Sequence, residues 1–234
     1  MYYGYYHLDP TYILIVIGMV ISLFASAKVK STYAKYSRVR SMSGMTGAQA
    51  AERILHSAGL YGVRIERVSG HLTDHYDPRT KVLRLSDSVY GSSSVAAIGV
   101  AAHECGHAVQ DEREYAPLRI RNALVPIANF GTSAAWPILV LGIIMGSSQF
   151  LVNLGILLFS LGVLFQLVTL PVEFNASKRA IQILGDTGIL YGEEVGQTRK
   201  VLGAAAMTYV AAAAASILSL LRLILLFGGR DRDE

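Results

Sequence analysis

The sequence predicts a mostly α-helical membrane protein, with about four transmembrane helices and a small cytoplasmic α+β element. Hydrophobic residues make up 52% of the 234 residues and the mean hydropathy is +0.40, which is too apolar for an ordinary soluble domain. The apolar residues also gather into four long stretches with almost no charge, each near the length that crosses a bilayer. Most of the charged residues lie in one segment between the first two stretches.

Four stretches are expected to span the membrane: residues 11–27, 123–145, 150–172 and 203–227. Pro126 and Pro137 should bend the second stretch, and Arg222 interrupts the fourth. The Ala25-Ser26-Ala27 run has the spacing of a signal-peptide cleavage site. No Lys or Arg precedes the first apolar stretch, however, so we expect a retained anchor.

The distribution of basic residues predicts the orientation in the membrane. Residues 28–121 carry 14 of the 21 Lys and Arg against nine acidic residues, a net charge of +5, whereas the first ten residues carry no Lys or Arg. The positive-inside rule then places residues 28–122 and 173–202 in the cytoplasm. Basic residues beside apolar runs suit a lipid bilayer, and no aromatic-basic motif points to nucleic acid. The single cysteine, Cys105, excludes an intrachain disulfide.

The cytoplasmic segment 28–122 is predicted to be folded, within one integral membrane domain that covers residues 1–234. Thr46 and Gln49 have the spacing of a capping box and open an amphipathic helix that should stop at Gly59. Residues 63–66 and 81–85 alternate as short strands do, with a turn at 77–80 before the second strand. A further helix should begin near residues 92–94 and end before Pro117.

That last helix carries the pattern H-E-x-x-H, formed by His103, Glu104 and His107. Residues four apart share one helix face about one turn apart, so the two imidazoles could hold one Zn²⁺ ion. Glu104 projects beside this face, where its carboxylate could take a proton from a metal-bound water. The pattern in its helical context therefore predicts a catalytic zinc site.

A catalytic zinc needs a third protein ligand and an open position. Glu173 is the preferred candidate because it follows the charge-free stretch 150–172, and a carboxylate at such a depth is costly unless it is paired or metal-bound. The alternative is an interfacial glutamate that pairs with Arg179. The other acidic candidates are Asp186, Glu193 and Glu194. Asp111, Glu112 and Glu114 continue the motif helix and are not expected to fold back onto the metal.

Four blocks of the chain resemble the YugP-type neutral zinc metallopeptidases of bacterial membranes. They are VAAHECGHAVQ at 100–110, LTDHYDP at 72–78, TLPVEFNAS at 169–177 and AAAMTYVA at 204–211. More distantly, the arrangement is similar to the HtpX and CAAX prenyl protease group, in which a glutamate on a later helix completes the zinc site. That likeness implies Glu173 as the third ligand. The distant group usually has Asp four residues after this glutamate, where the present chain has Ser177.

Several further residues have two interpretations. His71 and His75 could form a second metal pair, but they lie in a predicted loop that borders the cleft, where an extended substrate could pair with a strand edge. His75, Tyr76 or Arg179 could stabilise the oxyanion of the tetrahedral intermediate, or they could serve only in surface hydrogen bonds and in pairing with Glu173. Cys105 lies on another side of the helix and is expected to be a buried small residue.

The sequence thus predicts a membrane-embedded metalloendopeptidase of the bacterial cytoplasmic membrane, with one Zn²⁺ ion on the cytoplasmic side. Glu104 would act as general base on a zinc-activated water, and the substrates would be membrane or membrane-proximal polypeptides. One alternative is a zinc-stabilised, non-catalytic scaffold or partner-binding subunit, although such a site needs no general base. The other is a transporter-like protein with an incidental motif. Assembly as a homo-oligomer or with a membrane partner protein stays open.

Overall fold

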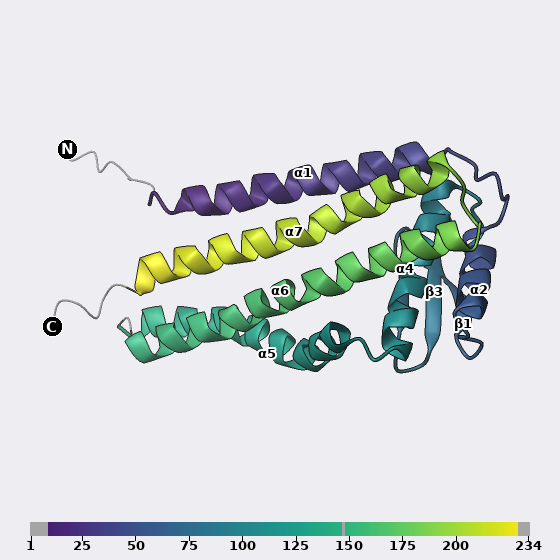
Figure 1. Ribbon diagram of the computed structural model, residues 1–234. Helices are drawn as coiled ribbons and strands as arrows, with labels where there is room; N and C mark the ends of the chain where they lie inside the picture. Colours follow the sequence, from purple (N-terminus) through teal and green to yellow (C-terminus); the bar gives the residue numbers. More distant parts are fainter. Residues whose placement is uncertain (1–8, 147, 229–234) are drawn as a thin grey trace. The chain divides into compact units, whose positions relative to one another are not determined.

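The computed structural model describes residues 9–146 and 148–228, and these are mostly helical as predicted. Figure 1 shows the elements in chain order. They are α1 (Tyr12–Tyr36), α2 (Gly47–Ser57), β1 (Arg64–Val68), β2 (His75–Asp77), β3 (Val82–Ser86), α3 (Asp87–Tyr90), α4 (Val95–Glu112), α5 (Ala116–Ile144), α6 (Gln149–Asp186) and α7 (Glu193–Phe227).

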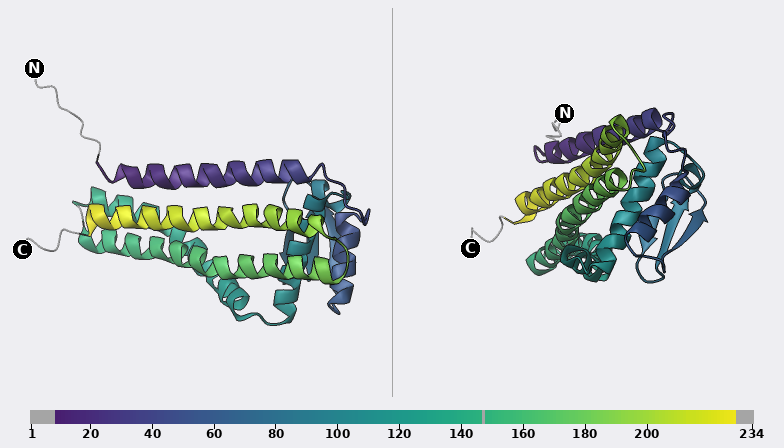
Figure 2. Two further views of the ribbon diagram at one scale, coloured as in Figure 1. Left: turned by 45° about the horizontal axis from the view of Figure 1, so that its top comes forward. Right: turned by 45° about the vertical axis from the view of Figure 1, so that its right-hand side comes forward.

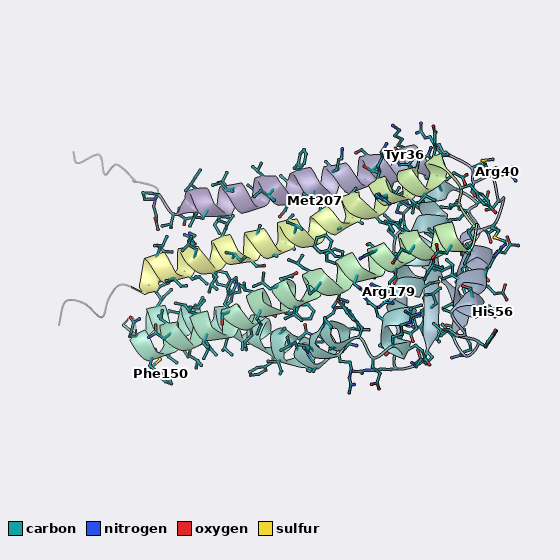
Figure 3. All side chains as sticks on the ribbon, in the orientation of Figure 1. Tyr36, Arg40, His56, Phe150, Arg179 and Met207 are labelled. Carbon is teal, nitrogen blue, oxygen red and sulfur yellow. The ribbon has the colours of Figure 1, made fainter. Side chains whose placement is uncertain are left out.

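Four of these helices, α1, α5, α6 and α7, are long and apolar enough to cross a membrane, which confirms the predicted number. Each extends beyond its apolar stretch into the neighbouring charged residues; α6 continues through Pro171 and α7 through Gly203. Large apolar side chains are exposed along these helices, among them Phe24 at 69% and Phe150 at 74% (Phe150 is labelled in Figure 3). Exposed apolar surface of this kind suits contact with lipid tails.

The chain divides into two compact units. The first comprises residues up to Phe24, Ala123–Val168 and residues from Val210 onward, and the second comprises Ala25–Asn122 and Thr169–Tyr209. The first unit therefore holds the apolar parts of the four long helices, and the second holds the sheet and the motif helix. The prediction of one peptidase domain over residues 1–234 stays a prediction.

In the first unit, α5, α6 and α7 meet around a small cluster of Leu139, Val152 and Leu223. Arg222, the charge that interrupts the fourth apolar stretch, lies with its guanidinium 4.3 Å from the centre of the Tyr12 ring on α1. A cation over an aromatic face is attracted by the electron-rich ring, so Tyr12 offsets part of the cost of placing this charge among apolar side chains.

The core of the second unit lies where α2 and α4 pack against each other and against the sheet (Figure 2). The predicted capping box is present: Thr46 Oγ1 accepts from the Gln49 N–H, and the Gln49 side chain accepts from the Thr46 N–H. Ile54 of α2, Ile98 of α4 and Leu83 of β3 are fully buried in this core. The amphipathic pattern in the sequence therefore selects the buried face of α2 correctly.

The sheet has the strand order β1-β3-β2, with β1 parallel and β2 antiparallel to β3. Two of its strands were predicted, whereas β2 falls inside the segment expected to be a loop. Tyr76 of β2 pairs with Leu83, so the two side chains share the face that packs against α4. A three-residue strand between Asp74 and Pro78 is too short to show an alternating pattern, and its pairing with β3 is what defines it.

Candidate metal centre

Helix α4 presents the two motif histidines. It begins after Ser94, whose hydroxyl accepts from the Ala97 N–H at 3.2 Å, and it ends before Pro117, as predicted. The rings of His103 and His107 lie 4.8 Å apart and nearly perpendicular, so their Nε2 atoms can approach a common point. Both side chains are only 13% exposed.

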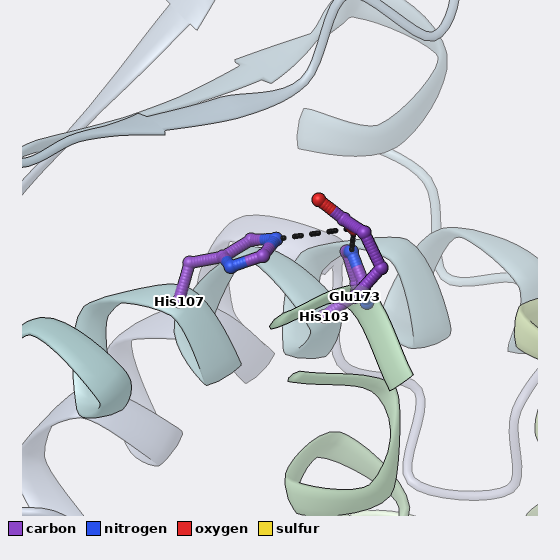
Figure 4. A group of neighbouring side chains, drawn as sticks. All are labelled: His103, His107 and Glu173. Atoms are coloured by element: carbon purple, nitrogen blue, oxygen red, sulfur yellow. Dashed lines mark ion pairs between the residues drawn. The ribbon is translucent and has the colours of Figure 1, made fainter. Parts of the chain in front are cut away.

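Glu173 reaches these histidines from α6. Its Oε2 lies 3.2 Å from His103 Nε2 and 3.5 Å from His107 Nε2, and the residue is 3% exposed. Figure 4 shows the three side chains converging from the two helices. The sequence-predicted trio is thus brought together although Glu173 stands 66 positions after His107 in the chain.

A glycine within the motif permits this approach of α6 to α4. A Cβ atom built on Gly106 would lie 2.6 Å from the Ala176 carbonyl oxygen, a backbone atom that cannot move aside on its own. Only glycine at position 106 therefore lets the backbone of α6 come close enough for Glu173 to reach the imidazoles. A Cβ atom built on Gly99, two turns earlier on α4, would lie 2.9 Å from the side-chain methyl group of Thr198 on α7.

The donor set and its spacing fit a zinc ion. Zinc prefers imidazole nitrogen and carboxylate oxygen at about 2.0–2.1 Å in tetrahedral array, which places ligand atoms about 3.3 Å from one another. The distances from Glu173 to the two histidines match that value, and all three ligand atoms lie within 4.8 Å of one another. Three protein ligands leave one tetrahedral position for a non-protein group, as catalytic rather than structural zinc sites require.

A proton competes with a metal ion for His107. Burial acts to lower the pKa of this imidazole, but the hydrogen bond that it donates to the Glu173 carboxylate and the Glu104 charge outweigh burial and raise the pKa above its ordinary value. Metal binding must displace that proton, so the affinity of the site falls as the pH falls.

Gln110 fixes the orientation of His107 from the next turn of α4. Its amide nitrogen donates to the Val172 carbonyl at 2.8 Å and to Asn175 Oδ1 at 3.0 Å, so its oxygen must be the atom that faces His107 Nδ1 at 3.0 Å. His107 therefore donates through Nδ1–H, which leaves Nε2 as the nitrogen that can bind a metal. Arg179 completes the chain by donating to Asn175 Oδ1 at 2.7 Å.

Replacing Gln110 with leucine should weaken zinc binding by about 10- to 100-fold, because the ring of His107 loses the partner that sets its tautomer and orientation. Titration against a chelator of known affinity measures this change. Gln182→Leu, at an exposed position of α6, is the matched control and should bind zinc as the unaltered protein does. An unchanged affinity in Gln110→Leu would show that His107 does not depend on this hydrogen bond.

Ser177 supports the other histidine. Its hydroxyl lies 3.1 Å from His103 Nδ1, one turn of α6 beyond Glu173. The partner of His103 is thus a neutral hydroxyl and the partner of His107 is a neutral amide, so both supporting groups are uncharged.

A polar cavity of about 160 Å³ opens over the site and includes His103, Glu104, His107 and Glu173 among its lining residues. Six other lining residues were not predicted as site residues: the polar Asp74, Arg121, Asn122 and Tyr209, and the apolar Pro78 and Leu118. Tyr209 lies in the 204–211 block that carries part of the resemblance, which was the one signal for it in the sequence. Asp74 is held in place by the Ser86 N–H and hydroxyl, at 2.7 and 2.9 Å.

The three candidates for oxyanion stabilisation lie in different surroundings. His75 and Tyr76 line the polar cavity, but the Tyr76 hydroxyl already donates to Asp111 on α4 at 2.8 Å. Burial and the Asp111 carboxylate raise the pKa of Tyr76, so its hydroxyl stays protonated and keeps this bond. Arg179, labelled on α6 in Figure 3, is not among the residues that line the cavity and reaches Asn175 instead.

The remaining alternatives have other partners. Glu194 accepts from the Met42 N–H at 2.7 Å and from the Tyr191 N–H at 3.2 Å, so it joins two loops rather than facing the histidines. His71 lies edge-on to the Tyr33 ring, whereas His75 Nδ1 contacts the Thr73 carbonyl, so the two do not share a partner. Cys105 is buried, as predicted, and its thiol contacts the Ala51 carbonyl.

Comparison with known proteins agrees with this geometry. Residues 11–228 match the protein family described as "Putative neutral zinc metallopeptidase". The "Putative membrane protease YugP" of Bacillus subtilis (strain 168) is 49% identical over 221 residues, which cover 94% of this chain and 98% of the relative. No solved structure matches the chain. The matched residues include every side chain of the metal centre.

Proposed function

Because the chain belongs to the family of neutral zinc metallopeptidases, which are hydrolases, we propose that it is a membrane-embedded zinc endopeptidase that cleaves membrane or membrane-proximal polypeptides. The observation that carries the proposal is the convergence of His103, His107 and Glu173 around a point beside Glu104. We assign the three converging side chains as ligands of a single zinc ion, with the fourth position open.

Zinc held by these three side chains would supply a Lewis acid that lowers the pKa of water to about 7. Glu104 is the residue placed to act as general base: it is 9% exposed, follows His103 in the chain and lines the polar cavity. Its carboxylate takes the proton of the attacking water and then delivers it to the leaving amine. Gln110 and Ser177 keep the two imidazoles oriented throughout.

The polypeptide substrate is proposed to bind in extended form along β2. The strand order leaves β2 at an edge of the sheet, and its residues His75 and Tyr76 line the polar cavity. An edge strand offers unpaired backbone groups that can pair with an added strand, which would lay the scissile bond across the cavity. His75 and the two cavity residues Arg121 and Tyr209 are then the candidates to stabilise the developing oxyanion.

We place the active site on the cytoplasmic side of the membrane. Residues 28–121, which include the motif helix, carry the excess of basic residues that the positive-inside rule associates with the cytoplasm. Glu173 directly follows the apolar stretch 150–172 within α6, so one ligand is attached to a membrane-spanning helix. This connection favours substrates that are themselves held at or near the bilayer.

Removal of zinc tests this proposal. The protein purified in detergent should contain one zinc ion per chain and cleave an unstructured protein such as casein. Dialysis against a chelator should abolish cleavage, and one equivalent of zinc should restore it, because the general base has no activated water without the metal. A zinc-loaded protein that cleaves no polypeptide would instead favour a scaffold role, and undiminished cleavage after zinc removal would exclude the zinc mechanism.

A further inference from the structure

A second cavity adjoins the metal centre, and its character is different. This cavity, the apolar pocket, has a volume of about 280 Å³ and is walled by Val29 and Tyr33 of α1, Val100 of α4, and Val201, Leu202 and Ala205 of α7. It shares four residues with the polar cavity: Asp74, His103, Glu104 and Tyr209. Glu104, the proposed general base, and His103, a proposed zinc ligand, therefore lie where the polar cavity and the apolar pocket meet.

From this arrangement we infer that the apolar pocket is the main specificity site of the peptidase and that it receives a large apolar side chain next to the scissile bond. The inference rests on the proposed function and names its substrate class. A peptide bond positioned at Glu104 has a side chain on each flank, and the shared residues place one flank at the mouth of the apolar pocket. Burying that side chain would release water from both surfaces.

The size of the pocket suits this class of side chain. An apolar cavity of about 150 Å³ accepts benzene in another protein, so 280 Å³ holds a benzyl, isobutyl or thioether side chain with room to spare. Ala205 of α7 contributes to this room because it adds only a methyl group to the wall. A small residue such as glycine or alanine would leave most of the pocket unfilled.

The chemistry of the walls selects against acidic side chains. Among the described lining residues there is no Lys or Arg, and the two charged groups other than the histidine, Asp74 and Glu104, are both acidic. An aspartate or glutamate entering this pocket would lose water and meet like charge without a partner. Two residues of the wall are fixed by packing, because Tyr33 and Val201 belong to one buried cluster with Ala96.

The experiment is a cleavage profile of the zinc-loaded full-length protein on a pool of random-sequence peptides, with mass spectrometry to locate each cleaved bond. The unaltered protein should favour Phe, Leu and Met at one flanking position over Gly and Ala by about 10- to 100-fold, and should avoid Asp and Glu there. Ala205→Phe fills the pocket and should shift that position to Gly, Ala and Ser. Val29→Ala enlarges the pocket and should increase cleavage at Trp.

Met207→Phe adds the same ring to α7 two residues from Ala205, at a position 48% exposed that does not line the pocket, and it should leave the profile unchanged. If Ala205→Phe fails to fold or to bind zinc, the cleavage profile of Val29→Ala tests the pocket assignment in its place. Cleavage with a profile that neither variant alters would overturn the pocket assignment alone. Absence of any cleavage by the zinc-loaded protein would overturn the proposed function and this inference with it.

Discussion

Glu104→Gln should abolish peptide cleavage while leaving zinc bound. The amide has nearly the shape of the carboxylate but cannot accept the proton of the attacking water, so kcat should fall by about 10²- to 10⁴-fold. Because the three assigned ligands are His103, His107 and Glu173, the zinc content should stay at one ion per chain. The measurement is kcat on a fluorogenic peptide together with metal analysis of the same sample.

Two outcomes of that experiment would count against the assignment of Glu104. Turnover within a few-fold of the unaltered protein would show that another group accepts the proton. Loss of zinc along with activity would show that Glu104 holds the metal, directly or through its neighbours. Glu112→Gln, at the end of the same helix and outside the polar cavity, is the control for the loss of one negative charge from α4.

Glu173→Gln is expected to lose zinc and activity together. A neutral amide is a poor zinc ligand, and the remaining two imidazoles do not complete a stable site. The fall in affinity should exceed the about 10- to 100-fold loss that follows removal of an outer-shell partner. Chelator competition measures the affinity, and the Glu104→Gln protein serves as the comparison that keeps zinc and loses only turnover.

Glu194→Gln provides the matched control for this change. Glu194 is also a buried glutamate of the second unit, but it accepts backbone N–H groups of Met42 and Tyr191 instead of facing the histidines. This variant should bind zinc normally once folded, even if its free energy of unfolding decreases. Full zinc affinity in Glu173→Gln would mean that a different residue closes the coordination shell.

The parts of the fold that sequence reasoning found are those with a local signal. Four apolar stretches predicted the four long helices, and the capping-box spacing of Thr46 and Gln49 predicted the start of α2. The spacing of His103 and His107 placed both on one face of α4. Each of these features depends on residues within a few positions of one another, so periodicity and capping chemistry suffice to find them.

The features that were missed depend on contacts between distant segments. Strand β2 exists because it pairs with β3, and a three-residue strand carries no periodicity of its own. Gln110 looks like any polar residue on a helix until Val172 and Asn175 of α6 fix its amide. Arg121 and Tyr209 reach the polar cavity from α5 and α7. No local pattern marks Arg121, and the one signal for Tyr209 was the resemblance of the block 204–211. Glu173 was an exception. Placing an unpaired carboxylate next to the apolar stretch 150–172 costs free energy, and this marked Glu173 as a candidate metal ligand in the sequence.

The most direct test of the account is X-ray absorption spectroscopy at the zinc edge on the full-length protein in detergent. We expect two imidazole nitrogens, one carboxylate oxygen and one further oxygen, all at about 2.0–2.1 Å, with the carboxylate contribution lost in Glu173→Gln. A sulfur ligand at about 2.3 Å, or a shell closed by four protein groups, would contradict an open catalytic site built from His103, His107 and Glu173.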